Sequence, residues 1–287
     1  KELKQGTADV IIAMDNDFER TLLREKKNEL LVTIDGVNSN SAGVIMSYIT
    51  AMLTEFNEKR AAEIIGSRSG QAAPRIITRT SYRYNPELTY SNYMVPGILV
   101  LLITIISMFL SSMNIVREKE IGTLEQLNVT PIKKHHFLAG KLIPIWILGL
   151  AELAFGIVLG LILFRIPFVG SPLLVFSCAA VYLIVVLGFG LLISTVNNTQ
   201  QQAMFISFFF MIIFILMSGL FTPLESIPAW ARILNIFNPL QYFITIMRMV
   251  LLKGSTFIDI SREFFILLIY GVCLLVLASL GYRKYSD

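Results

Sequence analysis

The chain has 287 residues, of which 55% are hydrophobic and 15% are charged. Because about a quarter of the residues in soluble domains are charged, this composition is typical of a membrane protein. The formal charge is +4, and residues 1–92 carry twelve basic and twelve acidic side chains, so the excess lies in residues 93–287. This distribution argues against nucleic-acid binding, which needs a basic face, and favours basic anchors on the cytosolic side of a membrane.

Residues 1–92 are predicted to form a small α/β domain. Three segments rich in β-branched and apolar residues are strand candidates: Ala8–Ala13, Glu29–Ile34 and Arg75–Thr80. Between the last two, Gly43–Ala62 repeats apolar residues at helical spacing: Val44, Tyr48, Met52 and Phe56. The chain begins at Lys1 in this polar region without a signal sequence, and we expect a membrane helix to precede it.

Residues 93–287 are predicted to form the transmembrane domain. A helix needs about 20 apolar residues to cross the hydrocarbon core. Five segments meet this requirement: about 94–116, 142–164, 173–195, 203–221 and 263–282. Basic residues in the connection 117–141 and in the C-terminal tail predict that both lie in the cytosol. Residues 1–92 and the connections 165–172 and 222–262 would then lie outside.

A dense charge cluster at residues 117–127 separates the first two apolar segments. Its basic residues alone would suit anchoring to lipid, but its three glutamates would be repelled by an anionic membrane surface. A helix with both signs of charge and an apolar side formed by Ile121, Leu124 and Leu127 is better suited to docking into a groove of another protein. The candidate docking residues are Arg117, Glu118, Lys119, Glu120, Gly122, Thr123, Glu125 and Gln126.

Helix-start signals occur further along the connection 117–141 and in the inner connection 197–202. Thr130-Pro131 combines an N-cap residue with a proline suited to the first turn, and predicts a second short helix at about 131–140. Thr199 and Gln202 have capping-box spacing for the next membrane helix.

The connection 222–262 is too apolar for a solvated loop. Prolines punctuate it, and this pattern predicts two short helices that dip partway into the membrane. The second is expected to start at Asn238-Pro239 and to end at Gly254. The alternative is an amphipathic helix that lies flat on the surface.

The sequence offers no motif for enzymatic chemistry. Gly140-Lys141 lacks the upstream glycine and the following hydroxyl of a phosphate-binding loop, and no H-E-x-x-H occurs. His135 and His136 are adjacent, so their rings point about 100° apart on a helix; a solvated face is favoured over a metal site. Cys178 and Cys273 lie in apolar segments and are expected to be buried thiols.

Glu152 is the one carboxylate deep in a predicted membrane segment. Ionisable groups inside a membrane are costly and are functional candidates, so Glu152 is a candidate for the transport pathway. An equally weighted alternative is a glutamate that faces a polar interface or is protonated. A proton-coupled carrier would need several such groups and an internal repeat, and the sequence has neither.

The run Arg117–Leu127, followed by Val129–Ile132 and Gly140-Lys141, resembles the signature R-E-x-E-x-G-T-x-E-Q-L-x-V-T-P of ABC-2-type ABC transporter permeases. Other stretches also resemble this family: Tyr84-Asn85-Pro86 with Val95-Pro96-Gly97, Gln200–Met204, Ser218–Pro228, Asn238–Phe243 with Arg248 and Lys253-Gly254, and Asp35–Ala42. The last is similar to the outer domain of the drug- and ion-exporting branch. The resemblance covers essentially the whole chain.

The resemblance implies a polytopic α-helical membrane protein with six membrane helices per subunit, the first of which is missing here, and a small extracytoplasmic α/β domain. It implies that the inner loop forms a coupling helix which docks on a separate ATP-binding subunit. Residues 222–254 would form an outer re-entrant gate. The residues expected at this gate are Pro223, Glu225, Pro228, Trp230, Pro239 and Arg248.

We therefore expect the permease subunit of an ATP-driven exporter in the plasma (bacterial inner) membrane, with residues 1–92 outside and the C-terminus in the cytoplasm. It would form the substrate pathway as a dimer with a second copy or a paralogue, in contact with membrane lipid. ATP and Mg would bind to the partner subunit and no cofactor to this chain; a periplasmic adaptor is a further candidate partner. The alternatives are a proton-coupled carrier and a membrane-anchored receptor or assembly factor.

Overall fold

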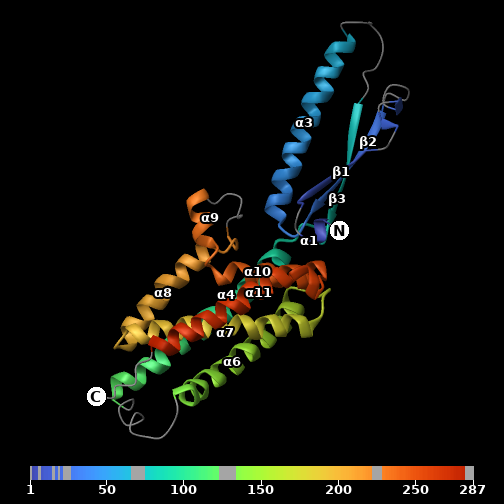
Figure 1. Ribbon diagram of the computed structural model, residues 1–287. Helices are drawn as coiled ribbons and strands as arrows, with labels where there is room; N and C mark the ends of the chain where they lie inside the picture. Colours follow the sequence, from blue (N-terminus) through green and yellow to red (C-terminus); the bar gives the residue numbers. More distant parts are fainter. Residues whose placement is uncertain are drawn as a thin grey trace. The chain divides into compact units, whose positions relative to one another are not determined.

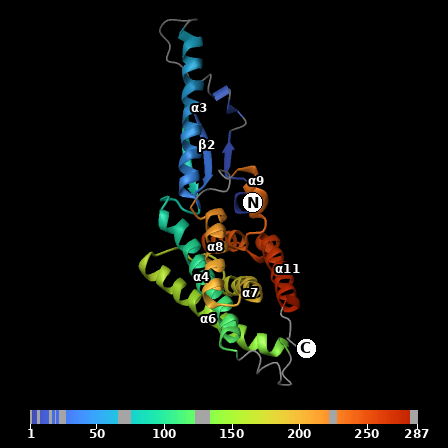
Figure 2. The same cartoon turned by 90° about the vertical axis from the view of Figure 1, so that its left-hand side faces the viewer.

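The computed structural model of the chain describes residues 2–5, 8–14, 17–18, 20–21, 27–65, 75–122, 134–221 and 228–281. The chain divides into two compact units, Lys1–Tyr93 and Met94–Asp287. Figures 1 and 2 show the elements of both units in two views at right angles. The first unit contains the β-sheet, and the second contains the long apolar helices.

The first unit is a three-stranded sheet with one long helix. Its elements are α1 (Glu2–Gln5), β1 (Val10–Ala13), β2 (Lys27–Asp35), α3 (Ser39–Ile65) and β3 (Arg75–Arg83). The central strand β2 pairs antiparallel with β1 and parallel with β3. A parallel pair requires a crossover connection, and α3 is part of the segment between β2 and β3. The three predicted strands and the predicted helix are confirmed; β2 and β3 are each three residues longer than expected, and β1 begins two residues later.

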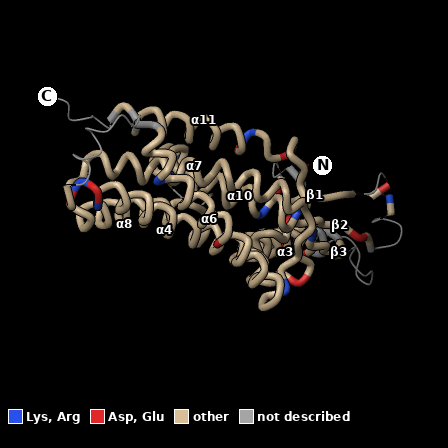
Figure 3. Tube along the Cα trace, turned by 90° about the horizontal axis from the view of Figure 1, so that it is seen from below, with Lys and Arg blue, Asp and Glu red and all other residues tan. Residues whose placement is uncertain are grey.

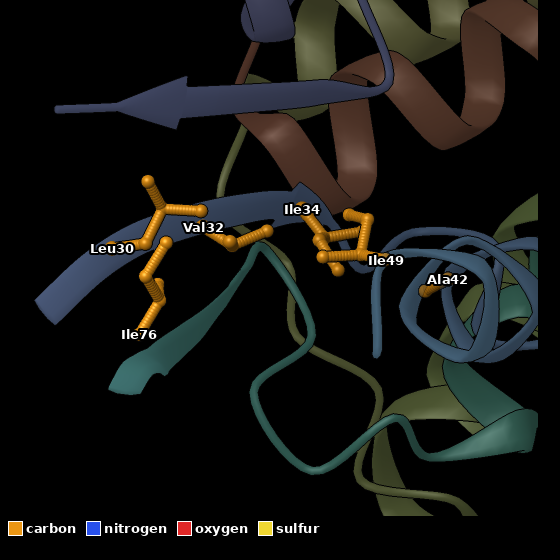
Figure 4. Packing of buried hydrophobic residues seen from close by; sticks show 6 residues of the cluster. All are labelled: Leu30, Val32, Ile34, Ala42, Ile49 and Ile76. Atoms are coloured by element: carbon orange, nitrogen blue, oxygen red, sulfur yellow. The ribbon is translucent and has the colours of Figure 1, made fainter. Parts of the chain in front are cut away.

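Alternate residues of β2 build the core of this unit, because successive side chains of a strand point to opposite faces. The buried core consists of Leu30, Val32, Ile34, Ala42, Ile49 and Ile76 (Figure 4). On the opposite face of β2, Leu31 is 44% exposed. The helix is also tied to β3, because the side-chain amide of Asn57 both donates to and accepts from the backbone of Ile76.

Helix α3 carries a second apolar stripe, which is the one that the sequence pattern identified. Its members are all exposed: Val44, Tyr48, Met52 and Phe56. The core is contacted instead by Ala42 and Ile49 on another side of the helix. The spacing of apolar residues therefore predicted a helix correctly but did not identify the face that meets the sheet, because α3 is apolar on more than one side.

The second unit consists of long helices and two shorter ones. Its elements are α4 (Tyr90–Ile121), α6 (Lys134–Leu163), α7 (Pro172–Val196), α8 (Gln200–Met217), α9 (Ala229–Asn235), α10 (Pro239–Lys253) and α11 (Phe257–Gly281). Among the described residues, five helices are long and apolar enough to cross a membrane, the number predicted: α4, α6, α7, α8 and α11. Figure 3 shows long stretches of these helices without charged residues.

Several helix boundaries and one cysteine differ from the sequence predictions; α8, for example, is Gln200–Met217 where 203–221 was predicted. The expected short helix at 131–140 is not separate, because α6 runs without a break from Lys134 to Leu163. Helix α11 starts six residues before the predicted 263, because Asp259 accepts two hydrogen bonds from Thr256 and caps the first turn. Cys178 is buried as expected, but Cys273 is exposed.

Helix α7 is at the centre of this unit and packs against α6, α8, α10 and α11. Close contact between α4 and α7 depends on Gly190, where an added Cβ would lie 2.7 Å from Ser111 Cβ and 2.9 Å from the Met108 carbonyl oxygen. Small residues commonly allow such close approach of helices in membranes. The Ser111 hydroxyl also donates to the Leu187 carbonyl oxygen at 2.9 Å. The two helices are therefore joined by both packing and a hydrogen bond.

We expect Gly190→Ala to lower the free energy of unfolding by roughly 1–3 kcal/mol, because the new methyl group would overpack the contact between α4 and α7. Gly140→Ala is the matched control, since no atom lies within 4 Å of its added Cβ and alanine favours a helix by about 1 kcal/mol over glycine. Thermal unfolding of the purified chain in detergent, followed by the fluorescence of Trp146 and Trp230, gives the unfolding midpoint of each variant. Equal midpoints for the two variants would contradict the predicted contact.

Candidate functional site

The charged end of α4, residues 117–122, is the first candidate site; we call it the α4-end cluster. The helix ends at Ile121, and Gly122 follows in the left-handed conformation with φ of 80°, which is the usual way for glycine to end a helix. The predicted docking residues Thr123, Glu125 and Gln126 lie outside the described residues. Arg117 and Ile121 are exposed, and the side chain of Ile121 is 62% accessible.

Glu118 connects α4 to α6. Its Oε1 atom lies 2.6 Å from Nζ of Lys141, and both side chains are partly buried. Partial burial and the short distance make this ion pair less screened than one on an open surface. The start of α6 is therefore linked to the end of α4.

Lys119 lies at the C-terminal end of α7. Its Nζ atom donates to the carbonyl oxygens of Ser194, Thr195 and Asn197, the last two at 3.2 Å. The last carbonyls of a helix have no partner within the helix and carry partial negative charge. Helix α7 has no basic residue in its own last turn, so Lys119 supplies the cation from another helix.

Glu120 lies at the N-terminal end of α8. Its Oε2 atom accepts from the backbone N–H of Gln200 at 3.3 Å and from the side-chain amide of Gln200 at 2.9 Å. Helix α8 has no acidic residue in its first turn, so Glu120 supplies the anion that a helix N-terminus favours. Thr199 completes this terminus by accepting from the backbone N–H of Gln202, which confirms the predicted cap.

The α4-end cluster thus contacts three other elements through consecutive residues. Sequence reasoning grouped Glu118, Lys119 and Glu120 as docking residues for another protein, and their contacts within the chain were missed. The sequence held only an indirect signal for these contacts. The last turn of α7 has no basic residue, the first turn of α8 has no acidic residue, and only three residues join the two helices. Within the described part of the cluster, Arg117, Glu120 and Ile121 are exposed, and Glu120 is the one of these three that also contacts α8.

The second candidate site is the α9–α10 hairpin, residues 228–254. Helix α10 starts and ends as predicted: Pro239 is its first residue, Asn238 caps it by accepting from the Leu240 N–H at 3.1 Å, and Gly254 follows it with φ of 59°. Most apolar side chains of α10 are buried, and α10 packs against α7, α8 and α11. The alternative prediction, an amphipathic helix that lies flat on the surface, would leave α10 with fewer contacts to other helices of the chain.

Asn238 also joins the hairpin to α8. Its amide donates to the Phe214 carbonyl oxygen at 2.9 Å and to the Asn235 side chain at 3.0 Å, and the residue is buried. Arg248 donates to the carbonyl oxygen of Gly219, just beyond the end of α8, at 3.3 Å. Two contacts from the hairpin therefore hold the end of α8 and the turn that follows it.

The remaining predicted gate residues that the structure describes differ in exposure. Trp230 is 68% exposed on α9, and Pro228 immediately precedes that helix. Pro239 is buried at the start of α10. Pro223 and Glu225 lie outside the described residues.

Glu152 is half-buried in the middle of α6. It follows Gly149 by three residues, and an added Cβ at Gly149 would contact Leu183 and Ser107, so this side of α6 packs against α4 and α7. The neighbouring Leu153 is fully buried. Glu152 therefore lies at the edge of the packed face of α6. Across the described residues, no group of three or more histidine, cysteine or acidic side chains could hold a metal ion.

Comparisons with known proteins agree on one family. The model of the family described as "ABC-2 family transporter protein" matches residues 1–280. Among relatives in Escherichia coli (strain K12), "Probable multidrug ABC transporter permease YbhR" is 32% identical over 247 residues, which is 86% of this chain and 66% of the relative. "Probable multidrug ABC transporter permease YbhS" is 27% identical over 257 residues, which is 88% of this chain and 67% of the relative.

"Inner membrane transport permease YhhJ" of Escherichia coli (strain K12) is 24% identical over 292 residues, which is 98% of this chain and 75% of the relative. The matched region spans just under two thirds of YbhR. No solved structure matches the chain. Because the family model covers nearly the whole sequence, and the matched signature includes the α4-end cluster, the chain belongs to the ABC-2 family of transporter proteins.

Proposed function

We propose that the chain is the membrane-spanning permease subunit of an ATP-driven exporter and that a separate ATP-binding subunit docks on the α4-end cluster. The observation that carries the proposal is the arrangement of this cluster: Arg117, Glu120 and Ile121 are exposed, and Glu118, Lys119 and Glu120 contact three other elements of the same unit. A partner that pushes on the exposed side would move several helices together. The names of the relatives, which are permeases, support the same function.

The proposed orientation places the α4-end cluster and the C-terminus in the cytoplasm and residues 1–92 outside. ATP and Mg would be held by the ATP-binding subunit, because this sequence has no phosphate-binding loop. Two permease subunits, either identical or paralogous, would enclose the substrate pathway in a bacterial inner membrane. The α9–α10 hairpin would close this pathway on the outer side.

Charge reversal combined with loss of the exposed apolar group tests the docking surface. We expect Arg117→Glu with Ile121→Asp to reduce co-purification of a co-expressed ATP-binding subunit by about tenfold, because an interface loses roughly 1–3 kcal/mol when a central contact is removed. Insertion into the membrane should remain, since neither side chain is buried. Arg262→Glu reverses an exposed helix charge elsewhere and serves as the control. Unchanged co-purification of the double variant would reject this docking surface.

Glu152→Gln tests whether this carboxylate lines the pathway. A pathway role predicts altered relative rates of export for cationic and neutral dyes from inverted membrane vesicles, because the carboxylate would attract a cation. ATP depletion should stop export in both proteins, whereas collapse of the proton gradient should not. Export that survives ATP depletion but stops with the gradient would favour a proton-coupled carrier, and identical dye selectivity would assign Glu152 a structural role.

Asn238→Ala tests the closure by the hairpin. The substitution removes the cap of α10 and the bond to the Phe214 carbonyl, and we expect it to cost about 2–4 kcal/mol of stability. If the hairpin closes the pathway, dye preloaded into vesicles should leak faster through the variant without ATP. Tyr242→Phe is the control, since it removes only an exposed hydrogen bond to Ile236. An equal leak rate in the wild type and Asn238→Ala would exclude a closing role.

A further inference from the structure

We infer that α8 is the element that connects the α4-end cluster to the α9–α10 hairpin, and that Lys119 and Glu120 are the positioning residues that make α8 follow α4. The inference rests on the proposed function for the source of the movement. Its structural basis is that side chains from other elements hold α8 at both of its ends. A helix of 18 residues spans about 27 Å, so contacts at its two ends join sites far apart.

The first end of α8 is fixed by a pair of opposite charges. Lys119 holds the last carbonyls of α7, and the adjacent Glu120 holds the first turn of α8. Each charge complements the partial charge of the helix end that it contacts. Because both residues belong to one turn of α4, a displacement of the α4 end must either carry the α7–α8 connection with it or break these contacts.

The second end of α8 is fixed by the hairpin. Asn238 donates to the Phe214 carbonyl oxygen, three residues before the end of α8, and Arg248 donates to the Gly219 carbonyl oxygen two residues beyond it. Asn238 also caps α10 through the Leu240 N–H. The position of the α10 start is therefore tied directly to the position of α8.

Much of the surface of α8 between these ends is open. Phe205, Phe209 and Leu216 are each at least 60% exposed. Contacts with the rest of the unit include the hydrogen bond between Ser207 and Ser112 and the edge contacts of Phe189 with two α8 rings at 5.3 Å. A helix with few lateral contacts moves at lower free-energy cost than one packed on every side. α8 is thus better suited than the buried α7 to transmit a displacement along its length.

Hydrogen exchange on the full chain with its co-purified ATP-binding subunit tests this inference without a known substrate. In the wild type, the non-hydrolysable nucleotide AMP-PNP should change the exchange of residues 238–243. In Lys119→Met and Glu120→Ala, exchange at residues 198–202 should become about tenfold faster without nucleotide, because charge-assisted contacts at helix ends are lost. The nucleotide response at residues 238–243 should disappear in the fraction of each variant that retains the ATP-binding subunit.

Lys119→Arg should restore both signals, since a guanidinium can also donate to several carbonyls. Arg262→Met removes an exposed helix cation and should leave them unchanged. A wild-type nucleotide response in both Lys119→Met and Glu120→Ala would overturn the connecting role of α8. Loss of co-purification in these variants would also overturn it, because the two residues would then be part of the docking surface. If the wild type binds no ATP-binding subunit, the proposed function fails. Unchanged exchange at residues 198–202 in the variants would instead overturn the positioning role of Lys119 and Glu120.

Discussion

Helix ends leave backbone N–H and carbonyl groups without partners inside the helix, and the partial charges at these ends favour side chains of the opposite sign. Helices α7 and α8 meet at a connection of three residues and have no complementary charge in their facing turns. Lys119 and Glu120 supply both charges from the end of α4. The need to satisfy these helix ends therefore makes the α7–α8 connection depend on α4, and the proposed transmission of movement follows from that dependence.

The same constraint applies at the other end of α8. Asn238 satisfies the Leu240 N–H at the start of α10 and also bonds the Phe214 carbonyl of α8, so one side chain serves two helices. A residue that caps one helix and contacts a second fixes their relative position with few atoms. The two ends of α8 are thus specified by local polar contacts, whereas α10 is held mainly by the burial of its apolar side chains.

Most elements of the fold could be predicted from local sequence signals. Apolar length identified the five membrane helices, and the caps at Thr199, Asn238 and Gly254 were recognised because they depend only on neighbouring residues. The start of α11 was missed because its first two turns contain Asp259 and Arg262, which lower the apolar character of the segment. The roles of Lys119 and Glu120 could not be derived, because their partners lie about 75–80 positions away in the chain. The spacing of apolar residues on α3 did not reveal which of its sides meets the sheet, because α3 is apolar on more than one side.

The helices of the second unit differ in how much of their surface is covered within the chain. The apolar stretches of α4 and α7 are mostly buried, while only a minority of the residues in those of α6, α8 and α11 are buried. In a membrane, the exposed sides face lipid or another subunit, and neither provides a hydrophobic force between helices. The position of α8 therefore depends strongly on its polar end contacts and on its aromatic contact with Phe189. Because α4 and α7 are joined at Gly190 and by the Ser111 hydrogen bond, the proposed displacement at the α4 end would reach α8 together with a movement of α7.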